Sequence, residues 1–167
     1  MRYFASFVVT LAWALWFGGI VALVLFVQTL FARNRTIALD AAAMLFVSFE
    51  RVQLLFAAAA CVGTFCWWVL TRRRAVMVLF ALFAVAAATA ALSTTLNTNP
   101  MERLRAEGRR ESPEFKALHR RSTSMYMVNL VLLLAAGAVL PRAMRITLAA
   151  SYDPAAPADT APNIAAA

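Results

Sequence analysis

FASFVVTLAWALWFGGIVALVLFVQTLF, residues 4–31, carries no charged side chain, and this stretch decides the fold class. A helix needs about 20 apolar residues to cross a hydrocarbon core about 30 Å thick. Three more uncharged stretches of about that length follow, at 52–70, 75–96 and 122–140. Four such stretches leave little of the chain for a water-facing domain, so the sequence predicts a membrane protein that crosses the bilayer several times.

We expect the spans to be helices, because backbone groups in lipid must form internal hydrogen bonds and no alternating pattern of barrel strands is present. The first stretch is longer than a signal-peptide core of about 7–15 residues, so we interpret it as a retained helix. The predicted architecture is an all-α integral membrane four-helix bundle with up-down topology. Its expected spans are about 4–31, 43–70, 75–96 and 122–140, the second extended because residues 41–49 are also apolar.

The one long connection, 97–121, contains two signals for the start of a helix. In Asn99-Pro100 and in Ser112-Pro113, a capping side chain precedes a proline, which is typical of a helix N-terminus. Gly108 lies between them and favours a helix stop. We therefore expect an amphipathic helix in this connection, then a turn, then a second helix that runs into the fourth span.

The composition agrees with a membrane domain followed by a short tail. The chain is 63% hydrophobic and 14% charged, whereas soluble domains average about 25% charged residues. We expect residues 1–146 to form a single transmembrane domain. Residues 147–167 are rich in Ala and Pro without an apolar period, so we expect them to be disordered.

The charge distribution bears on partners and on orientation. The net charge is +8, but the basic residues are split between two membrane faces and interleaved with acids, which argues against a nucleic-acid partner. Arg72, Arg73 and Arg74 form a dense triplet that is expected to bind lipid headgroups and to influence topology. Nine basic residues border the side of the long connection against six opposite. The positive-inside rule then places 97–121 in the cytoplasm, in a plasma or inner membrane.

Four polar side chains near the start of the fourth span share one helical face. They are His119, Ser122, Tyr126 and Asn129. Their i, i+3, i+7, i+10 spacing places them within a stripe about 80° wide. Because an unpartnered polar group in hydrocarbon is costly, the stripe is expected to face the bundle interior.

The up-down topology brings further polar residues to the same half of the membrane. They are Gln28, Glu50, Gln53 and Asn97. With the stripe, they predict a ligand-binding vestibule that opens toward the long connection and is closed by apolar packing at the other end. Simpler interpretations stay open: His119 as an interfacial residue, Asn129 as an interhelical clamp, and Glu50 at the membrane interface.

Small residues recur at helical spacing in the first three spans, which favours close helix packing in a membrane. The three sets are Ala14, Gly18 and Ala22; Ala57, Ala60, Cys61 and Thr64; and Ala81, Ala84, Ala88 and Ala91. We expect each set to lie in a contact between helices.

Little in the sequence points to catalysis or to a cofactor. A single histidine excludes a haem held by two histidines of one chain, and the Cys and His residues lack metal-ligand spacing. No nucleotide-binding loop or nucleophile elbow is present. We therefore expect no cofactor, no metal and no catalytic residue, and the chain is not predicted to be an enzyme.

Three motifs resemble a known family. They are WFGG at 16–19, LFVSFERVQ at 45–53, and the run TNPMERLR…SPEFKALHRRSTSMYMVN from 98 to 129. Together they are similar to the four-helix family catalogued as domain of unknown function 4149, which includes the transmembrane-protein-205-like proteins. The resemblance covers about residues 10–140 and implies an architecture and a set of positions, without an activity.

Two functions are compatible with these observations. In the first, the vestibule carries a small solute or an ion in transport or resistance, with His119 as a proton-linked gate. Four helices seldom enclose a pathway alone, so this function implies a homo-oligomer or a membrane-protein partner. In the second, the chain is a non-transporting scaffold or accessory subunit that binds a partner protein or anionic lipid, and the polar stripe only locks the helices together.

Overall fold

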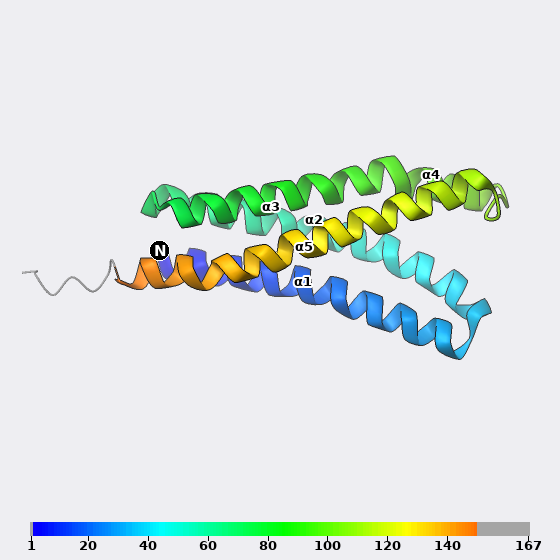
Figure 1. Cartoon of the computed structure of the whole chain (residues 1–167), viewed down its shortest axis with the longest axis horizontal. Helices are drawn as coiled ribbons and strands as arrows, with labels where there is room; N and C mark the ends of the chain where they lie inside the picture. Colours follow the sequence, from blue (N-terminus) through cyan, green and yellow to red (C-terminus); the bar gives the residue numbers. More distant parts are fainter. Residues whose placement is uncertain (1, 150–167) are drawn as a thin grey trace, which may run out of the picture.

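Four long helical segments run along the molecule in the computed structural model, which describes residues 2–149 (Figure 1). In chain order the elements are α1 (Arg2–Arg33), α2 (Arg35–Thr71), α3 (Arg74–Ser93), a π-helical turn η1 (Thr94–Thr98), α4 (Asn99–Ala106) and α5 (Pro113–Ala149). By length and composition, α1, α2, the α3–α4 segment and α5 could each cross a membrane. The prediction of an all-α four-helix membrane bundle is confirmed.

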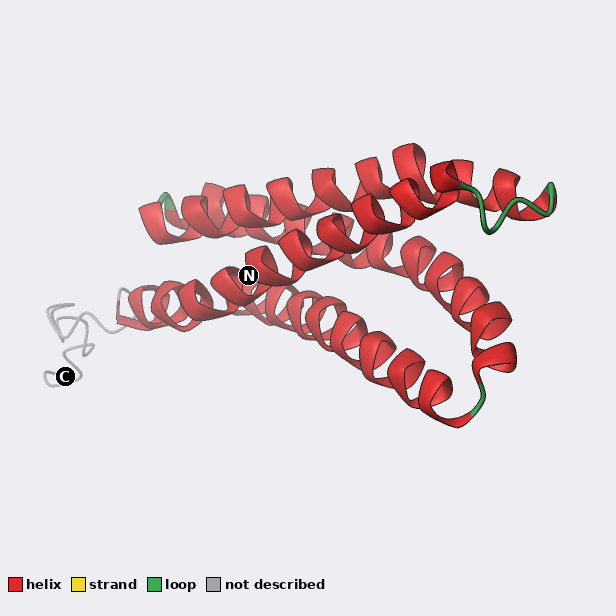
Figure 2. Ribbon diagram, turned by 45° about the vertical axis from the view of Figure 1, so that its right-hand side comes forward, coloured by secondary structure: helices red, strands yellow, loops and turns green. Residues whose placement is uncertain are grey.

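The helices pack in an up-down order. Along the chain, α1 packs mainly on α2, α2 on α3, and α3 on α5. The start of α1, the α2–α3 turn and the end of α5 therefore share one end of the bundle, and the α1–α2 turn and α4 share the other (Figure 1). We call these the arginine end and the α4 end. At the α4 end the α1–α2 hairpin diverges from the other helices (Figure 2).

The helix ends follow local capping chemistry more than hydropathy. Asn34 caps α2, its side-chain oxygen accepting from the Thr36 and Ile37 N–H groups at 3.1 Å, so α2 begins well before residue 43. The Ser112 hydroxyl accepts from the Phe115 N–H at 3.1 Å and caps α5. Gly108 ends the α4 segment with a φ of +72°. Thus the second predicted helix start and the predicted stop are confirmed.

An α-helix, α4, begins at Asn99 with Pro100 in its first turn, as predicted, but no side chain caps it, because the chain is already helical through α3 and η1. Proline has no N–H for the helical ladder, and its ring crowds the carbonyl four residues earlier. The π-helical turn η1 accommodates this, with the Asn99 N–H donating to the Thr94 carbonyl five residues back. Such single π turns are frequent at functional sites.

The apolar core lies toward the arginine end. Its largest fully buried members are Trp16, Trp67, Phe83, Ile20, Leu79 and Leu133. The Trp13 Nε1–H donates to the Leu133 carbonyl at 2.8 Å and ties α1 to α5. Gly137 makes this possible, since a Cβ there would clash with the Trp13 ring.

Only one of the three predicted small-residue faces is buried. On α2, Ala57, Ala60 and Thr64 are buried. On α1, Ala14, Gly18 and Ala22 are exposed, and a Cβ at Gly18 would meet no atom within 4 Å. Most of the predicted α3 set, Ala81, Ala88 and Ala91, is also exposed. The prediction was wrong for α1 and α3 because the faces bearing Trp16 and Phe83 supply more apolar volume to the core.

The predicted boundary between the domain and its tail falls near the end of α5. This helix continues to Ala149, three residues past the predicted domain end at 146. The rest of the predicted tail, residues 150–167, lies outside the described residues.

Candidate functional site in the buried polar half

Buried polar side chains gather in one half of the bundle, toward the α4 end. Seven of them, with the half-buried Tyr126, form what we call the polar cluster. Its buried members are Glu50, Gln53, Ser93, Asn97, Thr98, Ser122 and Asn129. Ser6 and Thr64, the two further buried polar residues in the part of the chain whose burial is described, lie outside it and donate to carbonyls of their own helices.

Glu50 is the carboxylic acid of the cluster and is 2% exposed. Its Oε1 accepts from the Thr98 hydroxyl at 2.7 Å and from the Tyr126 hydroxyl at 3.2 Å. Its Oε2 has no hydrogen-bond partner. No ion pair of the described residues includes this carboxyl. Glu50 is therefore held by hydroxyl donors from η1 and α5 and not by a basic side chain.

Arg51, next to Glu50 in the chain, does not neutralise it. Successive residues of a helix point about 100° apart, and Arg51 is exposed while Glu50 is buried. The sequence left open whether this pair lies at the interface or inside. The structure places the carboxyl inside the bundle and the guanidinium on its surface.

Four buried oxygen atoms of the cluster lack a hydrogen-bond partner among residues 2–149. They are Glu50 Oε2, Ser93 Oγ, Asn97 Oδ1 and Asn129 Oδ1. The Asn97 Nδ2 donates to Met125 Sδ at 3.1 Å, which sets the antiparallel register of η1 and α5. One turn further into the bundle, this register brings Ser93 and Asn129 to the same level. An unsatisfied buried polar group costs about 1–3 kcal/mol, so several in one region indicate a functional site.

The first helix joins the cluster through Trp16. Its indole N–H donates to Gln53 Oε1 at 3.4 Å, so all four long segments contribute a side chain to this region. One turn deeper than Gln53 and Asn129, the buried Ala57 and Leu133 begin the apolar core. The cluster is thus closed on the side of the arginine end.

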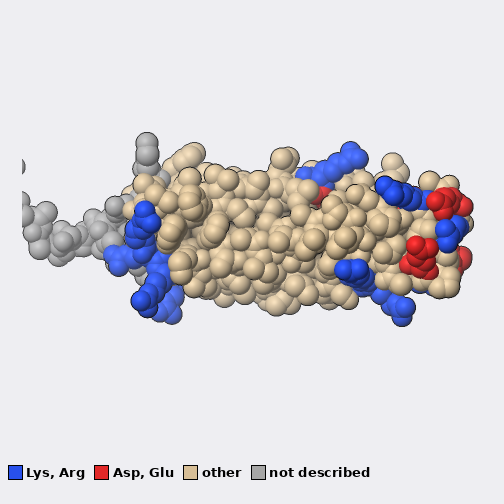
Figure 3. Space-filling view, turned by 90° about the horizontal axis from the view of Figure 1, so that it is seen from above, with Lys and Arg blue, Asp and Glu red and all other residues tan. Residues whose placement is uncertain are grey.

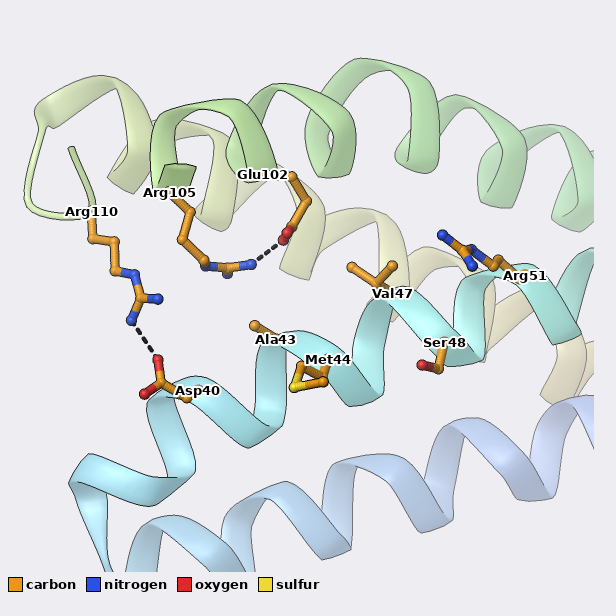
Figure 4. A pocket seen from close by; sticks show the side chains of 9 residues that line it. All are labelled: Asp40, Ala43, Met44, Val47, Ser48, Arg51, Glu102, Arg105 and Arg110. Atoms are coloured by element: carbon orange, nitrogen blue, oxygen red, sulfur yellow. Dashed lines mark hydrogen bonds and ion pairs between the residues drawn. The ribbon is translucent and has the colours of Figure 1, made fainter. Parts of the chain in front are cut away.

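A surface groove of about 390 Å³ lies beside the cluster, between the first half of α2 and α4 (Figure 4). It is lined by Asp40, Ala43, Met44, Val47, Ser48, Arg51, Glu102, Arg105 and Arg110. Arg110 donates to Asp40 at 2.7 Å across its outer part, and Arg105 pairs with Glu102 inside it. Glu102, one turn after Thr98, lines this α2–α4 groove, whereas Thr98 and Glu50 are not among its lining residues.

The structure separates two of the predicted site residues from the rest. His119 and Gln28 are exposed, contrary to the expectation that they share a vestibule with Glu50. His119 stacks on Phe115, with ring centroids 6.5 Å apart. The reason is that α5 begins beside α4, where the α1–α2 hairpin diverges (Figure 2). The first fully buried residue of α5 is Ser122.

Two cluster residues, Ser93 and Thr98, are absent from the predicted site. Thr98 is the one that regular helical spacing argues against. It directly follows Asn97, and two adjacent residues of a regular helix do not share a face. The π-helical turn adds a residue to this part of the helix, and both side chains are buried. The TNP sequence at 98–100 could have signalled this, because a proline inside a long apolar helix needs such an adjustment.

Comparison of the chain with family models, with curated proteins and with solved structures finds no match. The resemblance to the four-helix family of domain of unknown function 4149 therefore stays a prediction from the three motifs.

Proposed function

We propose that this multi-pass membrane protein transports a small polar solute coupled to protons, alone or as a subunit, and that Glu50 is its proton-binding residue. The observation that carries the proposal is the burial of Glu50 without a basic partner. Acidic side chains inside membrane spans are rare and mark ion and proton pathways.

The contacts of Glu50 favour a proton over a metal ion. Both hydroxyl partners donate to Oε1, which leaves Oε2 as the atom that gains and loses a proton. A hard metal cation needs several oxygen ligands around one point. The other titratable groups near this carboxyl are Tyr126 and Glu102, and neither is cationic.

The solute-binding part of the proposal uses the remaining cluster oxygens. Asn97, Asn129 and Ser93 each present a buried oxygen without a protein partner. These atoms suit a small solute with N–H or O–H donors. The groove between α2 and α4 supplies the entry, and a shift of η1 that breaks the Thr98–Glu50 hydrogen bond would connect it to the cluster.

A liposome assay tests the proposal. The full-length protein is reconstituted with a pH-sensitive dye inside, small polar solutes with N–H or O–H donors are supplied outside, and an imposed membrane potential drives protons inward. We expect the parent protein to acidify the lumen and Glu50→Gln to reduce the rate at least tenfold, because the amide cannot carry the proton. Glu111→Gln, exposed at the α4 end and outside the groove, is the matched control and should retain most of the flux. A parent protein without proton flux above empty liposomes would overturn the proposal.

The scaffold function is favoured by a different reading of the same contacts. The Trp16–Gln53, Thr98–Glu50 and Tyr126–Glu50 hydrogen bonds each join two helices. If they only lock the bundle, Glu50→Gln should change nothing measurable, since its amide oxygen still accepts both hydroxyl donors. The same variant thus separates the two functions.

A further inference from the structure

A second groove, of about 580 Å³, lies at the arginine end, where the α2–α3 turn meets α5. It is lined by Arg72, Arg73, Arg74, Ala75, Val78, Val139 and Arg142. The first three arginines come from the turn predicted to bind headgroups. The structure adds Arg142 from α5, at the other end of the chain, and an apolar floor of three side chains.

The arginines of this groove have no acidic counterpart among residues 2–149. The acidic residues in that range are Asp40, Glu50, Glu102, Glu107, Glu111 and Glu114, and all of them lie toward the α4 end. Asp153 and Asp159 lie outside the described residues. No ion pair within the described range involves an arginine of the groove. On the face that Figure 3 shows, the described surface of this end is blue without red.

The turn holds its arginines in a defined conformation. Arg72 has a φ of 52°, a left-handed conformation that is unfavourable for a residue with a side chain. Its N–H donates to the Trp68 carbonyl at 2.6 Å, and its guanidinium lies 4.9 Å from the Trp68 ring centroid. Arg73 precedes α3 and makes no side-chain capping hydrogen bond. The first N–H groups of α3 thus add to the positive potential of the groove.

We propose that this groove binds one anionic phospholipid. Its phosphate lies among Arg73, Arg74 and Arg142, and an acyl chain runs along Val78 and Val139. Guanidinium groups bind phosphate oxygens through paired hydrogen bonds. A lipid fits better than a soluble phosphate, because the floor is apolar and the groove adjoins the ends of three membrane-spanning helices. This site is independent of the proton transport proposed above.

Native mass spectrometry of the delipidated full-length protein tests the proposal. The probes are phosphatidylglycerol and phosphatidylcholine with identical acyl chains. We expect one phosphatidylglycerol to remain bound, with at least tenfold higher affinity than phosphatidylcholine. The triple variant Arg73→Gln, Arg74→Gln, Arg142→Gln should lose this preference. Val78→Trp fills the groove without changing the charge and should weaken phosphatidylglycerol binding several-fold.

The controls separate a specific site from general attraction. Arg120→Gln with Arg121→Gln removes two exposed arginines of the other membrane face and should leave the bound lipid in place. Inorganic phosphate at millimolar concentration should not displace it. Equal binding of the two lipids, unchanged binding by both groove variants, or displacement by phosphate would each overturn the proposal. Circular dichroism and size-exclusion chromatography check that the variants remain folded.

Discussion

The two ends of the bundle both carry several basic side chains, but they neutralise them differently. At the α4 end, the basic groups of Arg105, Arg109, Arg110 and Lys116 each form an ion pair with a carboxylate of the same chain. At the arginine end, within the described residues, four arginines share a groove without any carboxylate. The first end is partly neutralised by its own carboxylates, whereas the second has no carboxylate within the described residues and needs an anion from its surroundings.

The interior of the bundle also differs between its two ends: near the α4 end it is polar, and near the arginine end it is apolar. The half beneath the paired α4 end contains the polar cluster, with four buried oxygens that lack protein partners. The half beneath the arginine end contains Trp67, Phe83 and Leu79, which are fully buried. Apolar packing is thus concentrated in one half, and buried polar groups without partners in the other, as expected where a site is held by a rigid support.

Among changes that probe the difference between the two halves, removal of the Glu50 side chain should have the largest effect on the free energy of unfolding. Glu50→Ala leaves the Thr98 and Tyr126 hydroxyls without their acceptor and should lower the free energy of unfolding by about 2–3 kcal/mol. Glu50→Gln keeps an acceptor and should cost less than about 1 kcal/mol. Unfolding in mixed micelles with increasing denaturing detergent measures both. Equal losses for the two variants would show that the hydroxyl contacts contribute nothing.

How far these features could be predicted from the sequence depends on what controls each of them. The four spans were predictable because bilayer thickness fixes the length of an apolar helix. The start of α2 was not, since Asn34 caps a helix that extends beyond the hydrocarbon region. The buried face of α1 was also missed, because the volume of Trp16 decides it more than the small residues at 14, 18 and 22 do.

The residues of the candidate site also divide into those that the sequence could place and those that it could not. The polar stripe on α5 could be placed by helical spacing, and Ser122 and Asn129 are buried. His119 shares that spacing but lies where no helix of the α1–α2 hairpin covers α5. Thr98 could not be assigned, because the π-helical turn changes the register ahead of Pro100. Periodicity predicts which residues share a face, while the divergence of neighbouring helices decides where that face is covered.

Replacement of Asn129 should have a smaller effect on stability, with the opposite sign. Its buried Oδ1 has no partner, so Asn129→Leu removes an unsatisfied group at similar volume and should leave the protein unchanged or more stable by up to about 1 kcal/mol. Under the proposed function the same variant should impair solute-dependent proton flux. Leu133→Asn, one turn deeper in the apolar core, is the matched inverse and should destabilise. A strongly destabilised Asn129→Leu would identify this residue as the interhelical clamp.

The smallest effect is expected from the ion pairs that balance the α4 end. Arg110 and Asp40 are 2.7 Å apart, yet their side chains remain 45% and 68% exposed. Pairs exposed to this degree contribute about 0–1 kcal/mol, so Asp40→Asn should lower stability by less than about 0.5 kcal/mol. Its effect should vanish at high salt, because screening shortens the reach of exposed charges.

The informative measurement is the lipid preference of the Asp40→Asn variant. Arg110 then lacks its carboxylate, and the α4 end should gain weak, salt-sensitive affinity for phosphatidylglycerol. If it gains none, missing carboxylates alone do not make a lipid site, and the apolar floor formed by Val78 and Val139 distinguishes the arginine groove.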